Sequence, residues 1–287
     1  PPVYSLLGGD GRSAGLLLTT IFGLLAALTL SVWEVRDVNE VTGDEPHYLV
    51  MADGIIDHQT LEQTAPYRDE FMHNDITGGL APPDAEVTRA NTHAVNGPRG
   101  WYNVHNVGLP IVLAVPFALG QAVGAGVLAA KLALIAFGAA VVWMSWVFSS
   151  VLIKRRDHRM VAVGIAAIAL PLLPAASQVY PEVPGAAIAL AALCRLAIRR
   201  ARRDEFPVGR LFAIDHVVIV ALALLPWLHL RFGPIAVVLA VVMYFSEWSI
   251  PGHRSMSWMK LCLPFVVSFI VLLGYNWYAF DNVTGPY

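Results

Sequence analysis

Charged residues are scarce in this sequence. They make up 14% of its 287 residues, whereas they make up about a quarter of an ordinary soluble domain. Hydrophobic residues make up 56%, and the mean hydropathy is +0.59. Because a soluble core of this size could not bury so many apolar side chains, the composition excludes an ordinary soluble globular protein.

Cysteine and lysine are also rare. Cys194 and Cys262 are the two cysteines, and both lie in apolar segments close to basic ones, so we expect no disulfide. Only three of the 19 basic residues are lysine, a bias toward arginine that fits a GC-rich bacterial genome. The net charge is −2, and no basic patch is interleaved with aromatic residues. Without such a patch we expect no nucleic-acid partner.

The start of the sequence lacks the features of a signal peptide. The start, PPVYSLLGGDGRS, has neither a Lys/Arg-rich segment nor a small-residue cleavage site. We therefore expect the first apolar segment to be a retained helix rather than a signal peptide. The sequence begins without Met and stops abruptly at NVTGPY, so we expect both ends to be incomplete.

Long apolar runs are abundant and predict an all-α polytopic membrane protein, with residues 1–287 forming a single transmembrane module. About seven segments are close to the roughly 20 residues that a helix needs to cross the hydrocarbon core of a bilayer. These predicted spans are 14–33, 125–152, 160–177, 183–198, 211–228, 233–248 and 260–277.

An eighth apolar run, 107–123, contains Pro110 and Pro116 and ends in a glycine-rich segment. If it does not span, 13 of the 19 basic residues fall on one side of the membrane, as the positive-inside rule requires. We therefore predict that it is an interfacial, non-spanning helix on the outer face. This topology places the loop 34–106 outside the bacterial cytoplasmic membrane.

The outer loop begins with the motif GDEPHYL, which holds Asp44, Glu45, His47 and Tyr48. Pro46 favours a helix from about 47 to 57, whose N-terminus would stabilise ionised carboxylates. An ionised carboxylate is the form that a general base requires. The ordinary alternative is a solvated loop in which the aspartate caps the helix.

Three further outer segments carry candidate site residues. Tyr180 and Glu182 lie in the motif YPEVP at a hairpin turn, where a carboxylate at membrane depth is costly and usually functional. The alternative role for Glu182 is capping the next helix. Arg99, Tyr102 and His105 precede the interfacial helix and are predicted to close a substrate cavity from the side opposite Asp44.

Positive charge at the outer face comes from His229 and Arg231 in PWLHLR, and from Lys131 in the second span. An arginine there can bind a phosphate through two hydrogen bonds, with the histidine as a second donor. The alternatives are an interfacial anchor for Arg231 and a lysine that extends to a lipid headgroup. His58, His73 and His93 have no partner at metal-ligand spacing, so no metal site is predicted.

These motifs, in this order, resemble the bacterial lipid-linked-sugar glycosyltransferases of the GT-C fold, notably the branch of the protein mannosyltransferases and aminoarabinose transferases, and suggest an actinobacterial member. The resemblance covers most of the chain. It rests on GDEPHYL, YNVHNVGLP, YPEVP, PWLHLR and YNWYAFDNVTGPY, which all fall on the outer side. Relatives continue beyond the seventh span, and loop 58–100 has no motif that indicates a particular acceptor.

The resemblance implies a GT-C-like bundle and an inverting transfer of a sugar from a polyprenyl phosphate to a glycan, lipid or protein acceptor. It implies that Asp44 is the base, with Glu45 beside it and Glu182 as a second acidic residue. Arg231, His229 and Lys131 would stabilise the phosphate, and the remaining candidates would bind substrate. No cofactor is implied, and a divalent cation is left open. The alternative function is a membrane transporter or an assembly subunit that binds a partner through the outer loop.

Overall fold

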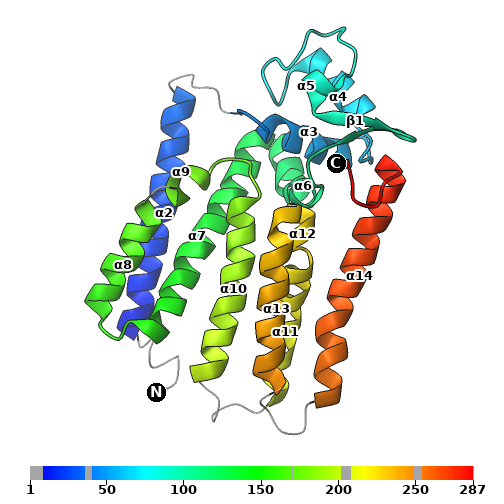
Figure 1. Cartoon of the computed structure of the whole chain (residues 1–287). Coiled ribbons are helices and arrows are strands. Elements are labelled where there is room, and N and C mark those ends of the chain that lie inside the picture. The colour runs from blue at the N-terminus through cyan, green and yellow to red at the C-terminus, as the bar shows by residue number, and fades with distance from the viewer. Residues whose placement is uncertain (1–8, 36–40, 170, 202–207, 249–253, 287) are drawn as a thin grey trace.

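The computed structural model describes residues 9–35, 41–169, 171–201, 208–248 and 254–286. Long helices run side by side and form one apolar bundle, capped at one end by the segments that follow the first helix (Figure 1). The long helices of the bundle are α2 (Gly9–Val35), α7 (Gly126–Leu152), α8 (Arg156–Ile168), α10 (Glu182–Ala201), α11 (Val208–Ala223), α13 (Gly233–Trp248) and α14 (Arg254–Phe280).

Three stretches of the described chain are long and apolar enough to cross a membrane: Gly11–Val32, Gly126–Leu152 and Leu261–Phe280. Large apolar side chains on their outer faces remain uncovered, such as Leu24 at 66% and Ile270 at 61% exposure. Water would disfavour such faces, whereas lipid hydrocarbon accepts them. The fold is therefore that of a helical membrane protein.

Two predicted spans are broken in the structure. The predicted helix 160–177 is divided into α8 and the single turn α9 (Leu172–Ala175), because Pro171 begins the new turn. The predicted helix 211–228 ends as α11 at Ala223 and restarts as α12 (Leu225–Leu228), with Pro226 in its first turn. With 13 residues, α8 is about 20 Å long, shorter than a hydrocarbon core of roughly 30 Å.

The capping end of the bundle consists mainly of residues from the predicted outer loop; residues 36–40 of that loop lie outside the described chain. It contains α3 (Glu45–Ile56), α4 (Thr64–His73), α5 (Arg89–Thr92) and a hairpin of β1 (Ala94–Gly97) and β2 (Gly100–Asn103). The prediction of an all-α chain was wrong for this hairpin. A small core of Val50, Tyr67, Phe71 and Val87 holds these elements together.

Helix α6 (Gly108–Gln121) lies at the same end of the bundle, below α3 (Figure 1). Leu109, Leu113 and Phe117 are buried in the main core of the bundle. Its 14 residues extend about 21 Å, and a turn at Gly124, which has a φ of +72°, leads directly into α7. The placement of α6 relative to a bilayer stays a prediction.

The opposite end of the bundle carries basic residues. The indole of Trp146 donates to the carbonyl of Gly11 at 2.9 Å, and the guanidinium of Arg159 lies 3.8 Å above the Trp146 ring. These contacts bring together the start of α2, the end of α7 and the start of α8, far from α3 in Figure 1. The predicted basic segment 195–210 is described only in part, because 202–207 lie outside the described residues.

Candidate active site

Asp44 occupies the N-cap position of α3 but makes no side-chain hydrogen bond to the helix. Its carboxylate points instead toward two histidines: Oδ1 lies 3.5 Å from Nδ1 of His93 and 3.6 Å from Nε2 of His105. The side chain is 44% exposed. A substrate can therefore reach this carboxylate from its exposed side. The two imidazoles face it from the other side.

The hairpin brings the two histidines together. His93 directly precedes β1 and His105 follows β2, and the backbone amide of Val104 donates to the carbonyl of His93 at 3.0 Å. The side-chain oxygen of Asn103 accepts from the backbone amide of His105 at 2.9 Å. Nδ1 of His93 and Nε2 of His105 lie 3.4 Å apart. The two rings therefore face each other across the base of the hairpin.

A third imidazole, His47, supports this cluster from α3. Its ring lies 4.0 Å from the His93 ring, and its Nδ1 is 2.6 Å from the hydroxyl of Tyr67. The Tyr67 hydroxyl donates its one proton to the carbonyl of Thr92 at 2.9 Å, so Nδ1 of His47 is the donor in the shorter contact. Burial, and then the neighbouring imidazoles, lower the pKa of His47 to about 3. The His47 ring is therefore neutral, and its hydrogen bond to Tyr67 fixes its position beside the site.

Burial also lowers the pKa of His105, against the opposing effect of the Asp44 carboxylate. Its ring is therefore neutral at pH 7, with one nitrogen lone pair available. Neutral imidazoles accept protons, accept hydrogen bonds and ligate metals.

Glu45, the neighbour of Asp44, has a different environment. It is 2% exposed, and both of its carboxylate oxygens accept hydrogen bonds from the backbone. Oε1 accepts from the amide of Val179 at 2.5 Å, and Oε2 accepts from the amide of Thr42 at 2.9 Å. The carboxylate therefore joins the start of α3 to the turn that precedes α10.

Tyr180 supports the same turn. Its hydroxyl lies 3.4 Å from both the carbonyl of Thr42 and the amide of Asp44. Gly43 has a φ of +61°, and a Cβ there would lie 2.5 Å from the Tyr180 hydroxyl. Glycine is thus required at this position both by conformation and by space.

Glu182, His229 and Arg231 form a second group at this end. The Arg231 guanidinium donates to the Glu182 carboxylate, and the backbone amide of Arg231 donates to Nδ1 of His229 at 3.2 Å. Burial, and then the positive charge of Arg231, lower the pKa of His229. Glu182 begins α10, and Arg231 lies in the 3-10 turn η1 (Leu230–Phe232).

The second group is electrostatically linked to the Asp44 cluster. Burial raises the pKa of the Tyr48 hydroxyl, and the charges of Asp44 and Glu182 raise it further, whereas Arg231 lowers it. His229 contributes, after burial, to the lowered pKa of His105. Segments more than 130 residues apart in the sequence therefore act on common groups at one end of the bundle.

Among the remaining predicted site residues, Arg99 and Tyr102 contact α14. Arg99 donates to the carbonyl of Tyr278 at 2.8 Å and lies 4.5 Å above its ring, which ties the hairpin to α14. Tyr102 packs edge-on against the same ring and lines a cavity of about 460 Å³ with Tyr275 and Tyr278. Lys131 is 3% exposed on α7, so it does not extend to the molecular surface.

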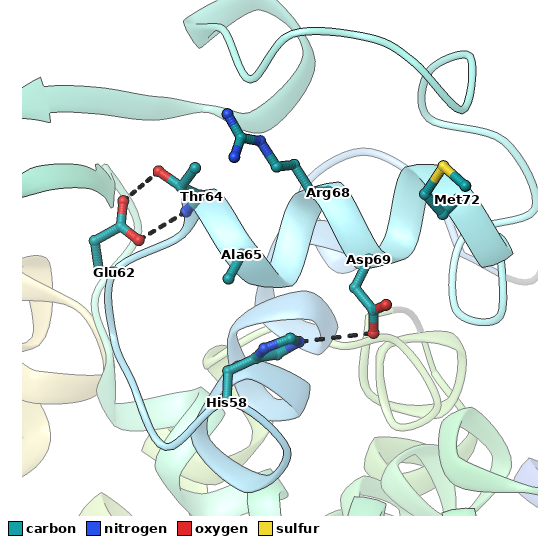
Figure 2. Close-up of a pocket in the computed structure, with 7 residues that line it drawn as sticks. All are labelled: His58, Glu62, Thr64, Ala65, Arg68, Asp69 and Met72. Atoms are coloured by element: carbon teal, nitrogen blue, oxygen red, sulfur yellow. Dashed lines mark hydrogen bonds and ion pairs between the residues drawn. The ribbon is translucent and has the colours of Figure 1, made fainter.

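A separate polar cluster lies between the end of α3 and α4. His58 faces Asp69, with Nε2 and Oδ2 3.6 Å apart, while Arg68 points away from this pair (Figure 2). Asp53 accepts from the side-chain amide of Gln121 at 2.7 Å. The adjacent cavity has a volume of about 390 Å³ and is lined by His58, Glu62, Thr64, Ala65, Arg68, Asp69 and Met72.

Sequence reasoning missed His93 as a partner of Asp44, together with the supporting roles of Tyr67 and Asn103. The 48 residues between Asp44 and His93 carry no spacing signal for a shared site. One local signal was present: in Gly97-Pro98-Arg99-Gly100, proline at the second position and glycine at the fourth are typical of a tight turn. A hairpin there would have placed His93 beside the segment that contains His105.

No family model, curated protein or solved structure matches this chain.

Proposed function

We propose that this protein is an inverting glycosyltransferase that moves a sugar from a polyprenyl phosphate to an acceptor hydroxyl of a cell-envelope glycan, lipid or protein. The observation that carries the proposal is geometric. The backbone amide of Asp44 lies 3.4 Å from the Tyr180 hydroxyl, and Glu182, two residues after Tyr180, pairs with Arg231, so the three outer segments meet at one end of an apolar helical bundle. A base and a phosphate-binding cation next to lipid are what a lipid-linked donor requires. The motifs that resemble the GT-C glycosyltransferases contribute these residues.

The proposal includes a membrane topology. Seven helices, α2, α7, α8 continued by α9, α10, α11 continued by α12, α13 and α14, would cross the bacterial cytoplasmic membrane as a GT-C-like bundle. The loop 34–106 would lie outside, with α6 in the outer interface. The breaks at Pro171 and Pro226 would then fall near the outer surface, where water and neighbouring side chains can satisfy the freed backbone groups.

In the proposed reaction, the acceptor oxygen attacks the anomeric carbon as Asp44 takes the hydroxyl proton. The bond between the anomeric carbon and the phosphate oxygen breaks, and polyprenyl phosphate leaves with the bonding electron pair. One displacement inverts the anomeric centre without a covalent sugar intermediate. Arg231 and His229 would stabilise the charge that develops on the phosphate.

The remaining residues divide by their contacts. Glu45 and Tyr180 would position the loop that carries Asp44, because their polar atoms contact that loop. Tyr48 and His47 would line the substrate site. Arg99 and Tyr102 would bind the acceptor, in the cavity beside α14 that Tyr102 lines. Lys131, buried on α7, would add positive charge for the donor phosphate.

The test is a donor panel. The purified protein is reconstituted in liposomes with radiolabelled polyprenyl-phosphate sugars, and release of polyprenyl phosphate is measured. We expect at least one sugar to be consumed. Arg231→Ala should raise the donor KM or lower kcat by about tenfold or more, in line with the loss of a charged hydrogen bond.

The matched control is Arg68→Ala, which removes an exposed arginine of the outer loop that points away from the His58–Asp69 pair (Figure 2). It should leave both constants unchanged. A donor that binds without being consumed would contradict the proposal and favour a transporter or a binding subunit. Equal effects of the two arginine variants would contradict the phosphate role of Arg231.

A further inference from the structure

Three side-chain atoms at the candidate active site form a nearly equilateral triangle. Nδ1 of His93, Nε2 of His105 and Oδ1 of Asp44 are separated by 3.4, 3.5 and 3.6 Å. In a tetrahedral zinc site with bonds of about 2.1 Å, any two ligand atoms lie about 3.4 Å apart. The triangle therefore has the size of one face of such a tetrahedron.

The scaffold holds the triangle in place without the help of a ligand. His93 has a φ of +52°, a left-handed conformation that is uncommon for a residue other than glycine. The hairpin fixes this residue through the bond from Val104, and Asn103 fixes the backbone of His105. The His47 ring, itself held by Tyr67, packs against the His93 ring at a tilt of 32°. Strained backbone and supported ligand rings are typical of preformed functional sites.

We infer that Asp44, His93 and His105 bind one divalent cation of the zinc type and leave a fourth coordination position open. Two imidazoles and one carboxylate suit Zn²⁺ or Co²⁺, whereas Mg²⁺ and Ca²⁺ prefer oxygen ligands throughout. Three protein ligands with one open position are the pattern of catalytic rather than structural zinc sites.

The role of this cation rests on the proposed function. The open position would take the acceptor hydroxyl and lower its pKa, as zinc does for bound water. Because only Oδ1 of Asp44 belongs to the triangle, Oδ2 is left to accept the proton.

The cluster of Asp53, His58 and Asp69 also brings one carboxylate or imidazole atom from each residue within 4.8 Å of the others. Both of its carboxylates already have partners outside the cluster, because Asp53 accepts from Gln121 and Oδ1 of Asp69 lies 3.1 Å from Nδ1 of His73. It therefore provides a matched control: the same residue types, in the same loop, outside the proposed site.

The test measures metal binding in the absence of any sugar. The purified full chain in detergent is treated with a chelator, dialysed and titrated with Zn²⁺ by calorimetry, and with Co²⁺ by visible absorption. We expect one equivalent of Zn²⁺ and the intense visible bands of tetrahedral Co²⁺. His93→Gln and His105→Gln should each weaken Zn²⁺ binding by more than about 100-fold, beyond the effect of losing an outer-shell partner.

Asp44→Asn is included because its half-exposed side chain is the least costly of the three to change, and it should also weaken binding. His58→Gln and Asp69→Asn should bind Zn²⁺ as the unchanged protein does. The inference is overturned if the unchanged protein binds no Zn²⁺, if binding survives the changes at His93 and His105, or if it depends on His58. Zinc binding without sugar transfer would contradict only the proposed function. Sugar transfer without zinc binding would contradict only this inference.

Discussion

Asp44 and Glu45 are adjacent carboxylates that the fold uses in different ways. Asp44 faces two imidazoles and is 44% exposed, whereas Glu45 is buried with both oxygens hydrogen-bonded to backbone amides. A base must be able to reach its substrate, and a carboxylate whose acceptor sites are filled cannot do so. The pair therefore divides into a candidate base and a positioning residue.

Glu45→Gln should lower the free energy of unfolding by about 1–3 kcal/mol, the range for losing charge-assisted hydrogen bonds at a buried site. A neutral amide accepts more weakly and places an N–H group opposite backbone donors. Thermal or chemical denaturation in detergent measures the change. Glu86→Gln is the control, because Glu86 is exposed in the same loop, and equal stability of the two variants would contradict the positioning role.

At this scale the sequence indicated which residue types could react, but not which groups they contact. The motif GDEPHYL indicated Asp44, but nothing in it distinguished Asp44 from Glu45, because the distinction depends on the amide of Val179, 134 residues away. Arg99 and Tyr102 were predicted to bind substrate because of their position before α6. Their contacts with Tyr278 could not be predicted, since no local pattern specifies which helix end a hairpin packs against.

Among the elements, the hairpin of β1 and β2 has the largest effect on the site, because it sets the separation of His93 and His105. It packs closely against the end of α14: a Cβ on Gly97 would lie 2.0 Å from the carbonyl oxygen of Ala279. Such an approach allows no side chain. The position of the hairpin, and so of both histidines, depends on this contact.

Gly97→Ala should destabilise the protein by about 1–3 kcal/mol through overpacking, and should weaken any function that requires His93 and His105 to stay together. The melting temperature measures the first effect. Gly274→Ala is the control on α14 itself, where a Cβ would meet no atom within 4 Å, and it should leave the melting temperature unchanged or raise it. A stable Gly97→Ala variant would show that the hairpin moves freely on α14.

Element types followed from the sequence where one physical effect dominates. Apolar runs of 16 or more residues became helices, such as α7 and α13, because only helices satisfy the backbone of such runs in lipid. The breaks before α9 and α12 occur at prolines whose effect on a short run depends on neighbouring helices. The strands β1 and β2 have four residues each, too few for a recognisable alternation.

For the whole molecule, polar residues gather at both ends of an apolar bundle, with acidic and imidazole groups at one end and arginines near α8 at the other. This separation agrees with the positive-inside rule if the end with α8 lies in the cytoplasm. The proposed donor also requires the end with Asp44 to lie outside, because lipid-linked sugars are consumed there by the GT-C glycosyltransferases that the motifs resemble.

Cysteine labelling tests this orientation. In a background with Cys194→Ala and Cys262→Ala, Asp84→Cys in the exposed part of the loop should react with a membrane-impermeant maleimide on intact cells. His158→Cys, at the start of α8, should react only after the cells are permeabilised, because its side chain is 62% exposed at the opposite end. The reverse pattern would place Asp44 in the cytoplasm and contradict the proposed topology.

The most direct test of the central claim is the single-turnover rate of sugar transfer by Asp44→Asn, with the donor identified from the panel. The control is Asp69→Asn, an aspartate of similar exposure in the same loop, at 47% against 44%. We predict that Asp44→Asn slows transfer by about 10²–10⁴-fold, the usual contribution of a general base, while its melting temperature is unchanged. Transfer at the rate of the Asp69→Asn control would contradict the assignment of Asp44 as the base.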